Sequence, residues 1–264
     1  MRALLFDMDG VLYNSEEPIP GAAETIRWVR EHNIPHLFVT NTTSRGRREL
    51  AGKLARFGIP GGVDDILTPC EVAAAWLHQR PAEPVALFVK PAALEAFAGI
   101  TRVPDDAEAG ARHVVIGDLG SAWDFATLNR AFRLLHAEPA ATLIALGMTR
   151  YWKAHDGISL DVAPFVAALE HAAGRSALVF GKPAPAFFEG AAAQLGVAKE
   201  EIVMVGDDIE TDVRGAMRAG LKGALVRTGK FRPSDLDSDR ESAVHPDAVL
   251  DSIASLPDWW DRAR

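Results

Sequence analysis

The sequence lacks the features of several protein classes. Its 264 residues include a single cysteine, Cys70, so no disulfide can form within the chain. No motif surrounds this cysteine, and we expect an inert, packed thiol rather than a nucleophile. No apolar run approaches the roughly 18 residues of a membrane span. The chain starts almost directly with an apolar strand, which leaves no room for a signal peptide, so we expect a cytoplasmic protein without a membrane partner.

Positive charge is also scarce. The chain has 28 Lys and Arg against 36 Asp and Glu, and a net charge of −8 argues against general nucleic-acid binding. It does not exclude a phosphorylated small molecule, because the local charge of a site can oppose the global one. Repeats and low-complexity tracts are absent from the sequence. With 48% hydrophobic residues, the chain has the composition of a soluble globular protein with a sizeable core.

What the chain does have is a short apolar strand that ends in two acids. Residues 3–6 form a continuous apolar run, typical of a strand buried on both faces of a parallel sheet. Asp7 and Asp9 follow, at the carboxyl end of the strand, where ligands of open α/β sheets bind. A tight turn is the simpler alternative. A calcium loop is disfavoured, because Val11 and Leu12 stand where it needs an oxygen ligand and a glycine.

Strands and helices alternate in both terminal parts of the chain. Apolar patterning predicts strands at 3–6, 36–39, 66–68, 177–180, 202–205 and 224–226. Helices are predicted between them, one with Ser44 as its N-cap, one closed by Gly196 and one ending at Gly220. A polar loop is expected at 230–247, and a last helix within 250–263. This order predicts an α/β fold with a Rossmann-like, doubly wound parallel sheet.

The middle of the chain has a pattern of its own. Strands are predicted at 85–89, 113–116 and 142–146, with helices around 125–135, capped by Asp124, and 165–172. A segment of about 105 residues is long enough for a separate core. We therefore predict a catalytic core made of residues 1–72 and 178–264, and an inserted α/β cap domain at 73–177.

Polar groups stand where four of the predicted core strands end. They are Asp7 and Asp9; Thr40 and Asn41; Lys182; and Asp207, Asp208 and Asp212. Each motif alone is more often a turn, a helix cap or a solvated lysine. Together they predict one site, and several carboxylates in one site repel unless a cation is present. Oxygen ligands favour Mg²⁺, and a lysine and a hydroxyl beside that ion suit a phosphoryl group.

These motifs, in this order, resemble those of the haloacid dehalogenase (HAD) superfamily of phosphatases. The matching stretches are 7–12, 39–41, 181–183 and 206–212, and the insertion lies where the subfamily with a large α/β cap, subfamily IIA, has its cap. Within the insertion, residues 129–135, 150–153, 156–157 and 164–165 look like the branch that contains phospholysine phosphohistidine inorganic pyrophosphate phosphatase. The resemblance implies a HAD-like core with a cap that selects the substrate.

The resemblance also implies a role for each acid of the first motif. Asp7 would attack phosphorus, giving an aspartyl-phosphate, and would ligate Mg²⁺. Asp9 would protonate the leaving group and then deprotonate the hydrolytic water, while its backbone carbonyl ligates the metal. An aspartate is an established type of nucleophile for this chemistry.

For the remaining positions the resemblance implies binding and orientation. Lys182 would neutralise the nucleophile and the phosphate, and Asp207 would complete the metal site. Asp208 and Asp212 would orient waters around the metal. The groups that hold the substrate would be Asp7, Met8, Asp9, Thr40, Asn41 and Lys182.

The leading hypothesis is a Mg²⁺-dependent phosphatase that acts on a small phosphorylated metabolite: a monoester or, alternatively, a phosphoamide or pyrophosphate. Dehalogenases share the fold but have no use for the acid Asp9. Phosphomutases usually carry a helical cap. A phosphate-binding regulatory protein without turnover is a further alternative, and loss of Asp7 or Lys182 would have indicated it. Caps of this type often dimerise, so a homodimer is one option, and the sequence leaves the substrate open.

Overall fold

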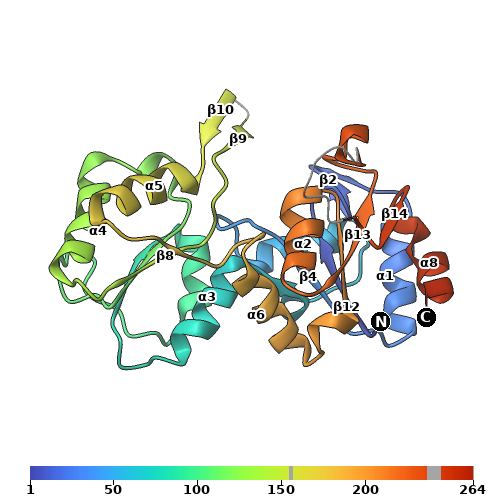
Figure 1. The fold of residues 1–264 in the computed structure, drawn as a ribbon, viewed down its shortest axis with the longest axis horizontal. Coiled ribbons are helices and arrows are strands. Elements are labelled where there is room, and N and C mark those ends of the chain that lie inside the picture. Colours follow the sequence, from blue (N-terminus) through green and yellow to red (C-terminus); the bar gives the residue numbers. More distant parts are fainter. Residues whose placement is uncertain (155–156, 237–244, 264) are drawn as a thin grey trace. The chain divides into compact units, whose positions relative to one another are not determined.

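A computed structural model describes residues 1–154, 157–236 and 245–263. The chain divides into two compact units (Figure 1). The first unit contains residues 1–40, 47–67 and 182–264, and the second contains 41–46 and 68–181. The predicted α/β fold class is confirmed, because each unit is built on a parallel sheet with helices. The division lies a few residues from the predicted limits of 72 and 177.

Among the described residues, the first unit forms a six-stranded sheet in the order β14-β13-β12-β1-β4-β5. All the neighbouring strands are parallel. Their bounds are β1 Ala3–Asp7, β4 His36–Val39, β5 Ile66–Leu67, β12 Ile202–Gly206, β13 Lys222–Val226 and β14 Ala248–Leu250. Because β1 lies between β4 and β12, the residues that follow these three strands meet at one edge of the sheet.

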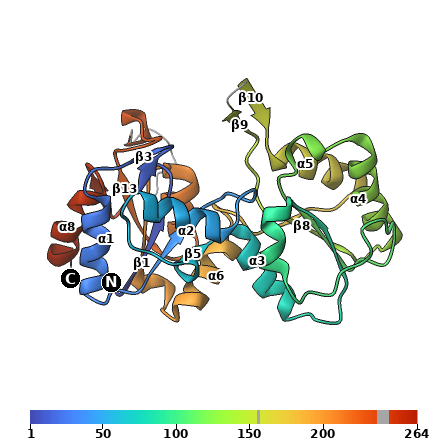
Figure 2. The ribbon, with the colours of Figure 1, turned by 180° about the vertical axis from the view of Figure 1, so that it is seen from behind.

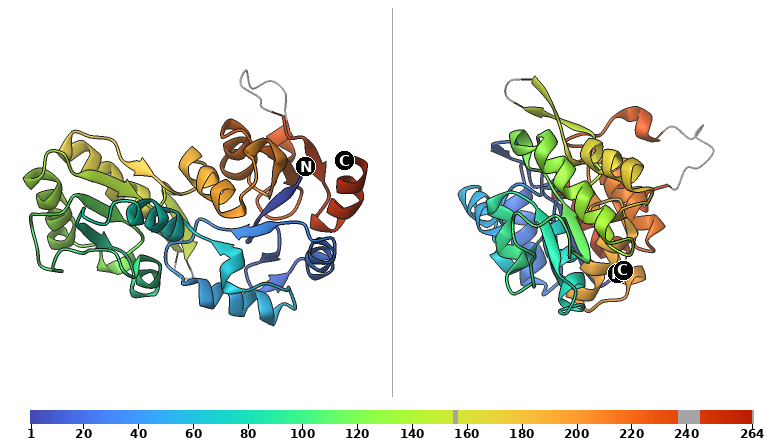
Figure 3. Two further views of the ribbon diagram at one scale, coloured as in Figure 1. Left: turned by 90° about the horizontal axis from the view of Figure 1, so that it is seen from below. Right: turned by 90° about the vertical axis from the view of Figure 1, so that its left-hand side faces the viewer.

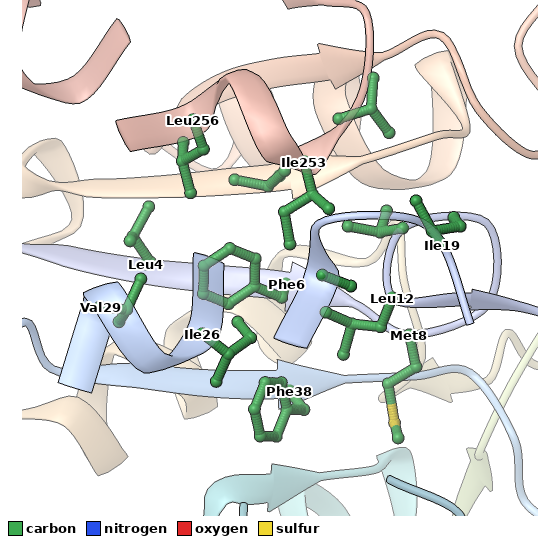
Figure 4. Close-up of a cluster of buried hydrophobic side chains, with 14 of the residues drawn as sticks. Leu4, Phe6, Met8, Leu12, Ile19, Ile26, Val29, Phe38, Ile253 and Leu256 are labelled. Atoms are coloured by element: carbon green, nitrogen blue, oxygen red, sulfur yellow. The ribbon is translucent and has the colours of Figure 1, made fainter. Parts of the chain in front are cut away.

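Helices cover both faces of this sheet (Figure 2). Alternate residues of β1, Leu4 and Phe6, face a core cluster that includes Ile26 of α1 and Leu256 of α8 (Figure 4). This alternation is the two-residue period of a strand. Buried side chains of α6 and of the segment after β12 cover the opposite face of the sheet. The helices are α1 Ala22–Glu31, α2 Arg47–Arg56, α6 Pro185–Leu195, α7 Gly215–Arg218 and α8 Leu256–Ala263.

One predicted core strand belongs to the other unit. Residues 177–180 were expected to extend the core sheet, but β11, Leu178–Val179, pairs with β8, Thr142–Ala145, of the second unit. Its four-residue apolar run predicts a buried strand but carries no information about its partner. Lys182 therefore enters the first unit from a connecting segment and not from the end of a core strand.

The second unit has a four-stranded parallel sheet within its described residues, in the order β11-β8-β7-β6. The predicted strands are confirmed as β6 Val85–Phe88, β7 His113–Ile116 and β8 Thr142–Ala145. The helices are α3 Pro69–His78, α4 Phe125–Ala137 and α5 Val162–Ala173. Asp124 caps α4 as predicted, because its side chain accepts a hydrogen bond from the Thr127 amide. Leu134, Val166 and their neighbours form a separate core.

Two antiparallel hairpins were not predicted. One joins β2, Tyr13–Asn14, to β3, Glu17–Pro18, directly after the first acidic motif. The other joins β9, Tyr151–Ala154, to β10, Gly157–Leu160, and projects from the second unit (Figure 3). Residues 147–150, which precede β9, form no helix or strand. The exposed large apolar residues of this hairpin are Tyr151, Trp152, Ile158 and Leu160.

Other local predictions have mixed outcomes. The helix closed by Gly196 is confirmed, since Gly196 adopts the left-handed conformation at the end of α6. Ser44 is not an N-cap, because α2 begins only at Arg47. The predicted loop at 230–247 is described up to residue 236 and from 245, and Asp156 also lies outside the described residues. Across the described ranges, no helix is long and apolar enough to cross a membrane.

Candidate active site

Asp7 lies in a buried charged cluster. It is the last residue of β1, and its Oδ1 accepts a hydrogen bond from the Lys182 ammonium at 2.5 Å. The same ammonium donates to Asp212 Oδ1 at 2.7 Å, and both of these partners are almost fully buried. Buried charges are tolerated when they are paired and hydrogen-bonded. The lysine thus compensates two carboxylates and allows them to lie close together.

Asp207 joins this cluster from the end of β12. Within the described part of the chain, carboxylate oxygens of Asp7, Asp207 and Asp212 all lie within 4.8 Å of one another. Asp207 Oδ1 is buried and has no hydrogen-bond partner among the described residues. An unsatisfied buried acceptor costs free energy, and a bound cation would remove that cost. The donor set consists of hard oxygens and fits Mg²⁺.

Burial changes the acidity of this cluster. It raises the pKa of Asp7 to about 7, an effect opposed by Lys182 and increased by Asp212 and Asp207. Burial also raises the pKa of Asp207 to about 6, with a further contribution from Asp212. For Lys182, burial acts to lower the pKa, but the Asp212 and Asp7 carboxylates raise it above its ordinary value. Protons therefore compete with a cation for Asp7 and Asp207 near neutral pH.

A π-helical turn, Ile209–Arg214, brings Asp212 back to the cluster. Asp208 caps this turn, because its Oδ1 accepts from the amides of Glu210 and Thr211 at 3.1 and 3.0 Å. The Asp208 amide in turn donates to Asp212 Oδ2 at 3.3 Å. π-Helical turns occur often at functional sites. Both acids are placed to orient other groups, and their predicted role toward metal-bound waters stays a prediction.

Asp9 is held apart from this acidic cluster. Its side chain is exposed, and its Oδ1 accepts a hydrogen bond from the Ser15 amide at 3.2 Å. The backbone of Asp9 also forms a bridge with Tyr13, and the Gly10 amide donates to the Tyr13 carbonyl at 2.7 Å. The β2–β3 hairpin thereby fixes a carboxyl group that is open to solvent. Such a group could exchange a proton with a leaving group or a water.

The predicted phosphate-holding residues have different surroundings. Thr40 directly follows Val39, whose register partner in β1 is Asp7, so the two strand ends are neighbours. Met8 is buried, and its side chain packs into the core cluster, which leaves only its backbone for a ligand (Figure 4). Asn41 begins the short segment 41–46 of the second unit. The proposed contacts of these residues with a phosphate stay predictions.

A loop that no sequence motif indicated also reaches this site. Thr228 Oγ1 donates to the Gly10 carbonyl at 2.5 Å, and the Lys230 amide donates to Asp207 Oδ2 at 2.7 Å. The Lys230 ammonium lies 3.5 Å from Asp208 Oδ2. This loop follows β13, the neighbour of β12. Ligands of α/β sheets bind beyond strand ends, and this rule could have indicated the loop after β13. Its residues alone, however, are typical of an ordinary turn.

Comparisons with known proteins show the family of the chain. A family model described as haloacid dehalogenase-like hydrolase matches residues 4–100, and a HAD-hydrolase-like model matches residues 179–256. The chain is 36% identical to phospholysine phosphohistidine inorganic pyrophosphate phosphatase of Homo sapiens over 263 residues, covering 98% of this chain and 93% of that protein. It is 38% identical to haloacid dehalogenase-like hydrolase domain-containing protein 2 of Bos taurus, covering 90% and 88%.

A solved structure is similar over almost the whole chain. The p-nitrophenyl phosphatase from Archaeoglobus fulgidus superposes with a TM-score of 0.87 at 28% sequence identity, and the match covers 98% of each chain. Both the sheet that holds the acidic cluster and the inserted unit therefore have counterparts in a known phosphatase structure.

Proposed function

The chain belongs to the haloacid dehalogenase-like hydrolases and is a phosphatase of that family, and from this premise we propose its chemistry. It hydrolyses a small phosphorylated metabolite, with Mg²⁺ bound, through an aspartyl-phosphate on Asp7. One observation carries the proposal. The Asp7 carboxylate lies 2.5 Å from a buried ammonium and within 4.8 Å of two further carboxylates, an arrangement that suits a nucleophile beside a metal.

The first step forms a bond between an Asp7 oxygen and phosphorus. The bond from phosphorus to the leaving oxygen breaks at the same centre, and its electron pair stays on that oxygen. Asp9 donates a proton to the leaving oxygen, which is why its carboxyl group must be accessible. Lys182 offsets the negative charge that gathers on Asp7 and on the phosphoryl oxygens.

The second step releases phosphate and restores the enzyme. Asp9, now deprotonated, takes a proton from a water that attacks phosphorus, and the bond between phosphorus and Asp7 breaks. Thr40, with the amides of Met8 and Asn41, would hold the phosphoryl oxygens throughout. The sequence of steps returns Asp9 to its acidic form, so no further reactant is needed.

Asp7, Asp207 and the Asp9 carbonyl are the groups that would hold Mg²⁺. When bound, Mg²⁺ would polarise the phosphoryl group and neutralise charge at the reacting oxygen. Asp212 accepts from Lys182 and from the Asp208 amide, which supports a role in orientation rather than direct ligation. The second unit would act as the cap that selects the substrate.

The substrate is proposed as a phosphate monoester, with phosphoamides and pyrophosphate as alternatives. An acid at Asp9 favours leaving groups that need a proton. The name of the human relative supports the two alternatives. A panel of esters, phosphoamides and pyrophosphate, assayed with Mg²⁺, would separate the three classes by their kcat/KM values.

The test of the nucleophile is Asp7→Asn. The amide has the same size but is a poor nucleophile, so phosphate release should disappear while the thermal melt shows a folded protein. Acid-quenched wild-type protein should yield a phosphorylated peptide that contains Asp7. Asp105→Asn is a matched control, because its side chain is 87% exposed in the second unit. Multiple turnover by pure Asp7→Asn would overturn the proposed mechanism.

A further inference from the structure

Lys53 is a buried cation that the proposed chemistry does not use. It lies in α2, its side chain is only 6% exposed, and its ammonium is 4.3 Å from the centre of the Tyr13 ring. The Phe57 ring is 5.9 Å from the same ammonium. The Glu16 carboxylate, at 3.3 Å, supplies an opposite charge. A desolvated ammonium needs such partners, so Lys53 ties together the groups that surround it.

Two of these partners belong to the β2–β3 hairpin. Tyr13 is a residue of β2, and Glu16 lies in the turn between the strands. Each strand has only two residues, and residues 14–18 are exposed. A short two-stranded ribbon is marginally stable alone. Its position must therefore come from anchors: the buried Tyr13 ring, which packs at 5.6 Å from Phe57, and the ammonium of Lys53 beside it.

The same hairpin fixes the carboxyl group of Asp9. The Ser15 amide, next to Glu16 in the turn, donates to Asp9 Oδ1. Ser15 has a φ of 51°, in the left-handed region that a non-glycine residue adopts only when its surroundings impose it. A shift of the turn would therefore move the amide that holds Asp9. The contacts run without a gap from Lys53 through Tyr13 and Glu16 to Asp9.

We propose that Lys53 is a positioning residue for Asp9: it anchors the β2–β3 hairpin, and the hairpin aims the Asp9 carboxyl at the leaving group. This inference rests on the proposed role of Asp9 as the acid. Lys53 does not touch the reacting atoms, and it acts through the contacts of Tyr13 and Glu16. Its loss should therefore weaken proton donation and leave the nucleophile Asp7 with its own partners, Lys182 and Asp212.

The test uses Lys53→Met in the full chain with Mg²⁺. Methionine keeps an unbranched apolar stem against Tyr13 and removes the charge. The measurement is kcat/KM for a series of phosphate monoesters, from nitrophenyl to alkyl, because this constant reports aspartyl-phosphate formation. Acid catalysis contributes about 10² to 10⁴-fold, so we expect a partial loss, of roughly 10-fold, that is larger for alkyl than for nitrophenyl esters. Lys53→Arg should restore much of the wild-type pattern.

Two further variants serve as a control and as a second test of the Lys53 contacts. Arg56→Met removes one positive charge from an exposed position of the same helix and should leave the leaving-group dependence unchanged. Glu16→Gln changes an exposed partner of Lys53, and we expect a smaller loss with the same bias toward alkyl esters. If thermal melts show that Lys53→Met does not fold, Glu16→Gln carries the test alone.

The outcomes separate this inference from the proposed function. The positioning role is judged where Asp9→Asn lowers kcat/KM more for alkyl than for nitrophenyl esters. In that case, an equal loss of kcat/KM on all esters, or no loss, in folded Lys53→Met would overturn the positioning role of Lys53. The same result in Glu16→Gln would overturn it where Lys53→Met is unfolded. If Asp9→Asn lowers kcat/KM equally for all leaving groups, Asp9 is not the acid, and the positioning role of Lys53 is also wrong.

Discussion

A single ammonium has to compensate more negative charge than it carries. Lys182 pairs with Asp7 and Asp212, and Asp207 adds a third carboxylate to the same buried space. Three unit negative charges and one positive charge leave an excess that burial makes costly. Burial is the main cause of the raised pKa values of Asp7 and Asp207, and the neighbouring carboxylates raise them further. A divalent cation would remove the excess negative charge, which is why the residues themselves favour a metal site.

The proposed role of Asp9 as the acid is best tested by a substitution that keeps its hydrogen bond. In Asp9→Asn, the amide oxygen can still accept from Ser15, so the hairpin should stay in place. We expect kcat/KM to fall about 10² to 10⁴-fold for alkyl phosphates and much less for nitrophenyl phosphate, whose leaving oxygen needs little help. Initial rates over a series of esters would measure this slope. Parallel losses for both kinds of ester would show that Asp9 is not the acid.

At the scale of elements, strand ends could be predicted from the sequence where an apolar run stops at acidic or small residues. β1 and β12 end this way, and Asp7 and Asp207 stand at their ends as expected. β4 is followed instead by Thr40 and Asn41, which are polar but not acidic. The assignment of 177–180 to the core sheet was wrong, because strand pairing depends on tertiary contacts that a short apolar run does not specify. The β2–β3 hairpin has two-residue strands, too short to show an alternating pattern.

The loop after β13 depends on glycine at position 229. Its φ is 63°, and a Cβ there would collide with the Asp207 carboxylate and lie 2.6 Å from the Gly10 Cα. Gly229→Ala should therefore displace Asp207. We expect Mg²⁺ affinity, measured by calorimetry, to fall about 10 to 100-fold, as for other residues that orient a metal ligand.

Gly196→Ala is the matched control for this loop. Gly196 has the same φ of 63°, but a Cβ there meets no described atom within 4 Å. Both variants should lose roughly 1–2 kcal/mol of stability from backbone strain. Only the substitution at 229 should weaken Mg²⁺ binding. Equal Mg²⁺ affinity in the two variants would mean that the loop does not position Asp207.

The β9–β10 hairpin is the element that we expect to influence substrate choice. Its side chains include Trp152, which is 48% exposed and offers a flat apolar surface with a polar tip. Trp152→Ala and Lys153→Ala should each change the ratio of kcat/KM between the best metabolite and nitrophenyl phosphate, with melting temperatures unchanged. Phe125→Ala, at an 83% exposed position of the same unit, should leave the ratio unchanged. A constant ratio in all three variants would exclude this hairpin from selectivity.

At the scale of the whole molecule, each unit has a sheet and a core cluster of its own. The insertion starts after β5 and returns just before Lys182, so it leaves the strand order of the first sheet intact. This arrangement could be anticipated from the separate run of strands and helices in the middle of the chain. The exact limits could not, because the segment 41–46 and the strand β11 take their unit from tertiary contacts.

The stability of the whole chain should depend on pH through its acidic cluster. In the unfolded chain Asp7 and Asp207 titrate near 3.8, whereas in the folded, metal-free protein their pKa values are about 7 and about 6. Between these values the folded state binds more protons than the unfolded state. The contribution of these two acids to stability is therefore present at low pH and is lost as the pH rises toward 7.

Mg²⁺ should reverse this loss, because it binds the deprotonated carboxylates. The melting temperature with Mg²⁺ minus that with EDTA should be small at pH 5 and should grow up to about pH 7.5. Each proton that Mg²⁺ displaces adds at most about 1.4 kcal/mol per pH unit to the Mg²⁺-dependent part of the free energy of unfolding. His36 and His113 have lowered pKa values caused by burial and act in the opposite direction, but they are common to both measurements and cancel in the difference. EDTA should also abolish phosphate release, and Mg²⁺ should restore it. Ca²⁺ should stabilise the protein yet support little turnover, since its looser coordination misplaces the nucleophile. A Mg²⁺ effect that is equally large at pH 5 and pH 7.5 would show that Asp7 and Asp207 do not bind the ion.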